Sequence, residues 1–357
     1  MLTTKGGNLM DFEMNLDERK IKILKAIIKD YILTGEPVGS RTISKKYELG
    51  VSSATIRNEM SDLEEWGFII QPHTSAGRIP SDKGYRLYVD KLMEYQAIED
   101  DQLRLFERIL EQKIDQIDEL MMEVAKLISY FTNYTSMVSS PQIQKTKLKH
   151  MQLIPLDKRS VMLIIVTDAN IVTNNVIRMD VPADQDTLNI LSNMLNESLR
   201  GLTIEEINLP LILSLKLKMG IYGEIVNSIL DAIDHTIQRK NTPDIYLSGT
   251  KNLLNFPEFG DLVKTKQIFH TLEEKELLAS LLSKAANDGI KIIIGQENEI
   301  DEMKHCSIIT ASYEIDGKTV GTIGVIGPTR MEYSKAVSIL SYISRNLDKL
   351  LKKISDG

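Results

Sequence analysis

The sequence predicts an α+β protein of several domains, with a helical N-terminal domain followed by a strand-rich domain that carries an insertion. Three observations predict this class. The first 95 residues place apolar side chains at helical spacing, residues 149–179 and 290–326 are rich in strand formers, and residues 184–240 between them are mostly helical. A chain of 357 residues has the length of about two or three domains.

The N-terminal residues predict three helices in helix-turn-helix order. The first begins at its N-cap Asp17 and ends at Gly35, and a short second helix covers residues 41–47. The third is capped by Ser52 or Ser53. Its inward stripe consists of three apolar residues at helical spacing: Ile56, Met60 and Leu63.

A β-hairpin is expected directly after the third helix. Residues 68–72 are typical of a strand, residues 73–77 of a turn and residues 78–80 of a short return strand. A hairpin in this position is the wing of a winged helix. Ser81 begins another helix.

Apolar residues at seven-residue spacing over residues 103–131 predict one long amphipathic helix. Two interpretations remain open. The helix packs on a sheet of its own domain, or it forms a coiled-coil seam between two chains.

Beyond Pro141 the sequence becomes strand-rich. Strands are expected at residues 149–154, 161–167, 171–179, 245–247, 290–294, 308–315 and 319–326. The pair Asp316-Gly317 predicts a tight hairpin turn, and residues 334–351 predict a closing helix. Early strands, a helical interruption and late strands indicate one α+β domain with an insertion.

The third helix has a polar face opposite its apolar stripe, which makes it a candidate for reading DNA bases. Arginine can fork onto guanine and asparagine onto adenine, while small neighbours allow close approach to the groove floor. The candidate base-reading residues are Ser53, Ala54, Arg57, Asn58 and Ser61. Acidic residues at the far end of this helix would repel phosphates, so its N-terminal half should enter the groove.

Other polar residues of this region are candidates for contacts to the DNA backbone. They lie on the second helix, in the wing and directly after it, where basic and hydroxyl groups could meet phosphates. They are Arg41, Lys45, Lys46, His73, Thr74, Ser75, Arg78, Lys83 and Arg86.

Charge and composition restrict the function classes. The net charge is −7, but residues 16–93 carry +2 and the rest −9, so a mildly basic region joins an acidic body. One cysteine excludes internal disulfides and favours the cytoplasm. The longest strictly apolar run has six residues, against about 20 needed to span a bilayer, so no membrane contact is expected.

No enzyme chemistry is predicted. The five histidines lack metal-ligand spacing, and Cys306 and His305 would point to opposite faces of an extended segment. The glycines at 321, 324 and 327 lie in a strand-rich run and indicate tight sheet packing, not a phosphate loop. We therefore expect no catalytic residue, no cofactor and no metal.

The run GEPVGSRTISKKYELGVSSATIRNEMSDLEEWGFIIQPHTSAGRIPSDKGYRLYVD, residues 35–90, closely resembles the winged-helix domain of the heat-inducible transcription repressors called HrcA. The resemblance continues through DIYLSGTKNLLNFPEF and DGKTVGTIGVIGPTRMEYSKAVSILSYIS, and so covers nearly all residues after about 15. It implies a winged helix, a GAF-like domain and an inserted dimerisation domain.

The resemblance and the strand pattern together set the expected boundaries. Residues 1–15 form a flexible tail, 16–95 the winged-helix domain, 96–182 with 265–357 the GAF-like domain, and 183–264 the inserted dimerisation domain. The resemblance further implies a homodimer that binds an inverted-repeat operator upstream of chaperone operons and represses them, supported by the chaperonin.

Two other functions remain open. The chain could be an effector-responsive winged-helix regulator with a small-molecule pocket in the GAF-like domain. It could also use its winged helix for protein contacts without DNA.

Overall fold

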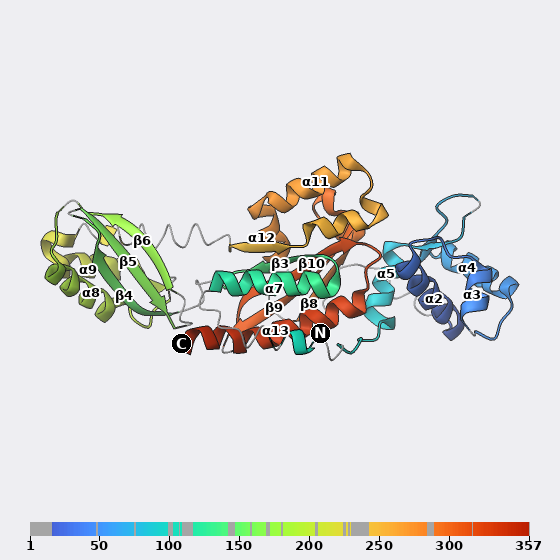
Figure 1. Cartoon of the computed structure of the whole chain (residues 1–357), viewed down its shortest axis with the longest axis horizontal. Helices are drawn as coiled ribbons and strands as arrows, with labels where there is room; N and C mark the ends of the chain where they lie inside the picture. The colour runs from blue at the N-terminus through green and yellow to red at the C-terminus, as the bar shows by residue number, and fades with distance from the viewer. Residues whose placement is uncertain are drawn as a thin grey trace.

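The structure is a computed structural model. It describes residues 16–47, 49–74, 76–98, 103–106, 108, 117–141, 147–157, 159–168, 172–179, 181–203, 206–223, 226–227, 229, 243–283, 289–315 and 317–356. Three units follow one another along the long axis (Figure 1): the head, residues 16–92; the body, residues 117–139 and 245–356; and the lobe, residues 147–229. The predicted tail, residues 1–15, lies outside the described residues.

The head has the predicted order of elements. Its helices are α2 (Glu18–Thr34), α3 (Ser40–Lys46) and α4 (Ser53–Glu65), followed by β1 (Ile69–Ile70), β2 (Ile79–Pro80), α5 (Asp82–Leu87) and a π-helical turn η1 (Tyr88–Leu92). Asp17 caps α2 by accepting from the Lys20 N–H, and Gly35 ends it in the left-handed conformation, as the sequence predicts. Strands β1 and β2 pair antiparallel.

The body is built on a five-stranded antiparallel sheet. Its strand order is β7 (Ile245–Ser248), β3 (Thr135–Ser139), β10 (Lys318–Pro328), β9 (Cys306–Ile315) and β8 (Ile290–Ile294). Helices α7 (Ile117–Thr132) and α13 (Tyr333–Asp356) cover one face, and α11 (Leu262–Glu273) and α12 (Lys275–Ser283) cover the other (Figure 1). Short 3-10 turns η5 (Thr250–Asn255), η6 (Pro257–Phe259), η7 (Gly295–Glu297) and η8 (Asp301–Met303) connect them.

Two predictions for the body can be compared directly. Over Ile117–Thr132 the predicted long helix packs on the sheet of its own unit, with seven of its apolar side chains buried, which is the first of the two open interpretations. Residues 107 and 109–116 of that prediction lie outside the described residues. The glycines of β10 pack tightly, since a Cβ at Gly321 would lie 2.4 Å from the Tyr313 ring.

The lobe is a separate layer of sheet and helix. Strands β4 (Leu148–Pro155), β5 (Ser160–Thr167) and β6 (Val172–Arg178) form an antiparallel sheet, and helices α8 (Gln185–Leu199) and α9 (Leu209–Met219), with the 3-10 turn η4 (Gly220–Tyr222), accompany it. The apolar core of the lobe contains buried residues between 148 and 229 and shares none with the two core clusters of head and body, among the described residues.

The predicted boundaries of the insertion differ from the structure. Residues 149–179 are expected in the same domain as the late strands, but they form the lobe's own sheet, while β7, expected inside the insertion, pairs with β3 of the body. The part of the chain that leaves the body sheet to form the lobe thus runs between Ser140 and Asp244, whereas the insertion is expected at residues 183–264. The reason is that period-two alternation predicts a strand without saying which sheet it joins.

Among the described residues, no helix combines the length and the apolar character needed to cross a membrane.

Candidate nucleic-acid interface

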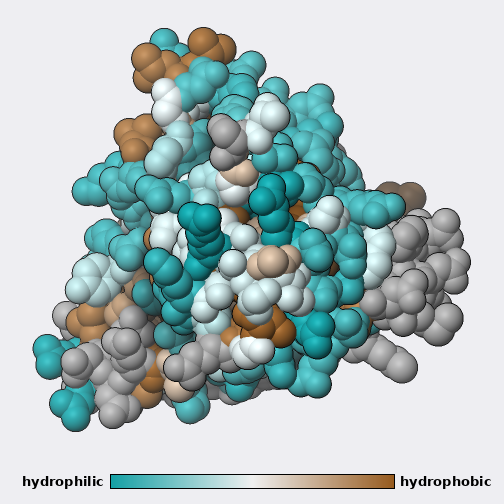
Figure 2. All heavy atoms as spheres, turned by 90° about the vertical axis from the view of Figure 1, so that its right-hand side faces the viewer, coloured by the Kyte–Doolittle hydropathy of each residue, from teal (hydrophilic) through white to brown (hydrophobic). Residues whose placement is uncertain are grey.

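Helix α4 presents a polar face on a well-anchored helix. Ser52 caps it by accepting from the Thr55 N–H at 3.1 Å, and Ile56, Met60 and Leu63 are 0–4% exposed in the core with α2 and α3. Of the predicted base-reading residues, Ser53 is half-exposed. The other four are exposed on the side of α4 opposite the core: Ala54, Arg57, Asn58 and Ser61. Figure 2 looks onto the end of the molecule that carries the head, where hydrophilic side chains cover most of the surface.

An ion-pair cluster fixes α4 against α2. The Lys20 ammonium lies 2.6 Å from a Glu59 carboxylate oxygen and 3.2 Å from an oxygen of Asp62. The hydrogen bond to Glu59 raises the pKa of Lys20 although burial acts the other way, so the ammonium stays charged. Sequence reasoning missed this contact, because it read the acidic residues only as a repulsive end of the helix.

The β1–β2 hairpin, which the sequence predicts as a wing, is tied to the loop between α2 and α3. Val38 and Arg78 exchange two backbone hydrogen bonds of 2.8 and 2.9 Å, and Gly77 fits beside them because a Cβ there would lie 2.6 Å from the Val38 carbonyl. At the tip, the Gln71 amide donates to the carbonyls of Thr74 and Ala76. His73 and Thr74 are exposed, and Ser75 lies outside the described residues.

The predicted phosphate contacts divide into exposed and engaged side chains. Arg41 and Lys45 are exposed on α3. Lys46 pairs with the buried carboxylate of Asp30, and Arg78 donates to Glu64 at 2.8 Å. These two cations therefore hold head elements together, while the Lys46 side chain remains about half exposed.

The remaining two basic residues form hydrogen bonds within the protein. Lys83 donates to the Trp66 carbonyl at 2.8 Å, and the 22%-exposed Arg86 side chain reaches the body, where it binds Glu297. These contacts favour structural roles for Lys83 and Arg86 over the predicted phosphate contacts. Their partners lie 17 and 211 residues away in sequence, beyond the reach of local patterns.

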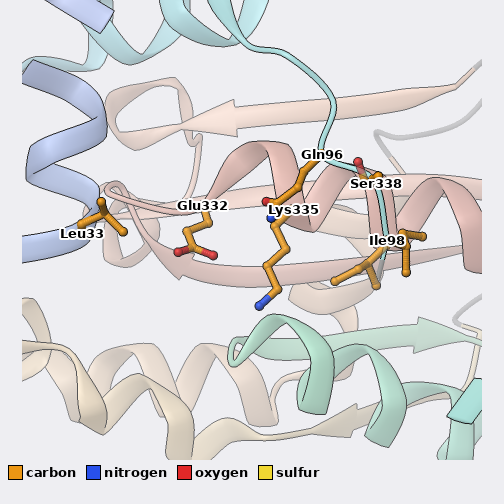
Figure 3. A pocket seen from close by; sticks show the side chains of 8 residues that line it. Leu33, Gln96, Ile98, Glu332, Lys335 and Ser338 are labelled. Carbon is orange, nitrogen blue, oxygen red and sulfur yellow. The ribbon is translucent and has the colours of Figure 1, made fainter. Parts of the chain in front are cut away.

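A small ligand would need a hollow, and a metal ion would need a group of ligand side chains. A hollow of about 420 Å³ lies between the C-terminal end of α2, residues 96–98 and the start of α13, lined by Leu33, Glu332 and Lys335 among others (Figure 3).

No group of three or more potential ligand side chains is arranged for a metal in the described chain. Cys306 is buried, and burial raises its pKa to about 12, which disfavours a reactive thiolate.

Comparison with known proteins decides the family. The model for the HrcA protein C terminal domain matches residues 118–337. A heat-inducible transcription repressor HrcA of Lachnoclostridium phytofermentans is 48% identical over 96% of this chain and all of the relative, and one of Ruminiclostridium cellulolyticum is 46% identical over the same shares. The chain belongs to the HrcA family.

HrcA relatives are named heat-inducible transcription repressors, which places this chain among the transcription repressors of the heat-shock stress response. A crystal structure described as that of a hypothetical protein superimposes with a TM-score of 0.61, covering 96% of this chain and all of that one at 23% identity. This likeness shows a shared fold of mixed helix and sheet. For an HrcA, the polar face of α4 is the natural candidate for the DNA contact.

Proposed function

We propose that this HrcA represses chaperone operons in the cytoplasm by binding an inverted-repeat operator as a homodimer. The observation that carries the proposal is the face of α4, where exposed Arg57 and Asn58 lie beside the small Ala54 and Ser61 on a capped, core-anchored helix. Both long side chains have the groups for bidentate contacts to base edges in a major groove. In this proposal the body is the GAF-like domain.

In this proposal α3 contributes phosphate contacts, and Lys45→Ala tests them. Because the side chain is exposed and cationic, its loss should weaken operator and random duplex alike and lower the log–log salt slope by about one. The measurement is binding affinity across a salt series. Lys126→Ala, which removes a cation on α7 paired with Glu123, is the matched control and should leave the slope unchanged.

The lobe supports a homodimer because one face of its sheet has no partner within the described chain. Val161, Leu163 and Ile165 of β5 are 0–4% exposed in the lobe's core, so the alternate residues point to the other face. That face carries two apolar ends, Ile154, Met162 and Val176 at one and Val166 and Val172 at the other, with Ile164 between them beside the polar Gln152 and Asn174. Three of these apolar residues are 37–65% exposed.

A second copy would cover this face by packing sheet against sheet. Of the 19 exposed large apolar residues in the described chain, 10 lie in the lobe, which favours the lobe over head and body as the interface. Two-fold symmetry would then present two heads to the two halves of an inverted repeat.

The double substitution Ile164→Lys and Val176→Lys should raise the Kd of the dimer by about 100-fold, because two charges would have to be desolvated in an apolar interface. Sedimentation at several concentrations measures this, and circular dichroism checks the fold. Leu213→Lys on the exposed side of α9 is the control. Dissociation by Leu213→Lys alone would place the interface on α9 and reject the sheet face.

We further propose that the chaperonin supports repression by keeping a marginally stable repressor folded. The alternative is control by a small molecule, for which the hollow beside α13 is the candidate site. Operator binding by purified protein, with and without chaperonin and without added metabolite, separates the two. An increase in operator binding on addition of the chaperonin alone would support the chaperonin proposal.

A further inference from the structure

We propose that two arginines, Arg86 of the head and Arg330 of the body, lock the head onto the body and thereby set the half-site spacing that the dimer accepts. The inference rests on the proposed function, and its first readout needs no DNA. Arg86 extends from the head to the body, and Arg330 extends from the body to the head.

Arg86 reaches from α5 into the loop after β8. Its Nε donates to Glu297 Oε1 at 2.8 Å, its Nη2 donates to the Ile292 carbonyl at 2.7 Å, and a second contact to Glu297 completes a fork. Its Nη1 also donates to Asp90 of the head at 3.2 Å. One guanidinium thus joins two elements of the body to two of the head.

Arg330 reaches the other way, from the segment between β10 and α13. Its Nη1 donates to the Ile32 carbonyl in the last turn of α2 at 3.3 Å, and it pairs with Glu258 while lying over the Phe256 ring. Its guanidinium packs against Gly35, where an added Cβ would lie 3.1 Å from Cζ. With 11% exposure, the side chain is largely shielded from water.

The rest of the junction is packed as well. The buried apolar residues of the head and of the α7–α13 face of the body form one continuous cluster, with the Tyr85 and Tyr333 rings 5.8 Å apart. Asp82 of α5 accepts from the Gln296 N–H at 2.9 Å. The head is therefore held by side chains, not by residues 93–98 alone.

This lock matters because both α4 helices must reach their half-sites at once. In a dimer held by the lobes, the positions of the two α4 helices follow from how each head sits on its body. A fixed head accepts one spacing and helical phase of the half-sites, whereas a loosened head accepts several at lower affinity. Arg86 and Arg330 act here as positioning residues.

The first readout is a distance distribution between spin labels at Lys22→Cys on α2 and Tyr130→Cys on α7, both exposed, with native Cys306 buried. In the otherwise unsubstituted chain we expect a narrow distribution of label–label distances. The double substitution Arg330→Ala and Glu297→Gln should broaden this distribution. Arg86→Glu should broaden it too, and combining Arg86→Glu with Glu297→Arg should narrow it again. Lys304→Ala, which breaks a pair inside the body, is the control and should leave it narrow.

The second readout uses the inverted repeat enriched by the unsubstituted chain from a random library, with the half-sites moved apart by two or five base pairs. The unsubstituted dimer should bind one spacing more tightly than the others. In the variant with Arg330→Ala and Glu297→Gln, the ratio of affinities between the preferred and the altered spacings should fall about tenfold, while the affinity for a single half-site stays the same. A distribution that stays narrow, or an unchanged preference, overturns the lock. Enrichment of no inverted repeat by the unsubstituted chain would instead reject the proposed function and leave the label result to stand alone.

Discussion

Arg57→Ala and Asn58→Ala should each lower affinity for the operator by about 1–3 kcal/mol, roughly five- to 150-fold, with little change on random duplex. Both side chains are exposed on α4 and neither packs in the core, so the fold should keep its stability. A lost bidentate contact removes discrimination at one base pair, which is why the effect is confined to specific sites. Competition between operator and random duplex, at one stated salt concentration, measures it.

Glu65→Ala is the matched control for this pair, since Glu65 is exposed on the last turn of the same helix, away from the proposed groove contact. It should leave operator preference unchanged. If either Arg57→Ala or Asn58→Ala retains full preference while circular dichroism is unaltered, the base-reading face has been assigned to the wrong residues.

Local patterns were sufficient to predict the head. Caps at Asp17 and Ser52 and the stripe through Ile56 depend on neighbours three or four residues away, which a sequence displays directly. The same reasoning placed Arg57 and Asn58 on the exposed side of α4.

Long-range partners were beyond such patterns. The sequence predicts β4, β5 and β6 as strands, yet their separation from the central sheet follows from tertiary pairing. Arg86 was predicted to contact phosphates because nothing near it in the sequence revealed Glu297, the carboxylate that accepts from its guanidinium in the structure.

Removal of the whole insertion should convert the repressor into a folded monomer. The ends of the insertion lie together, because Ser139 is opposite Ile245 and the Ser140 N–H donates to the Asp244 carbonyl at 2.7 Å. Replacing residues 141–243 with Asn-Gly would close β3 and β7 as a two-residue hairpin. Since the lobe's core shares no described residue with the other cores, head and body should still melt cooperatively.

The deletion protein should keep its half-site affinity but bind the full operator about 100- to 10,000-fold more weakly. A monomer loses the effective concentration with which the first bound head delivers the second to its half-site. Sedimentation gives the oligomeric state, and titration of single and paired half-sites gives the two affinities. A deletion protein that melts cooperatively and still sediments as a dimer would move the two-fold contact to the body, where the helical residues 103–106 and α7 would be the next surface to test.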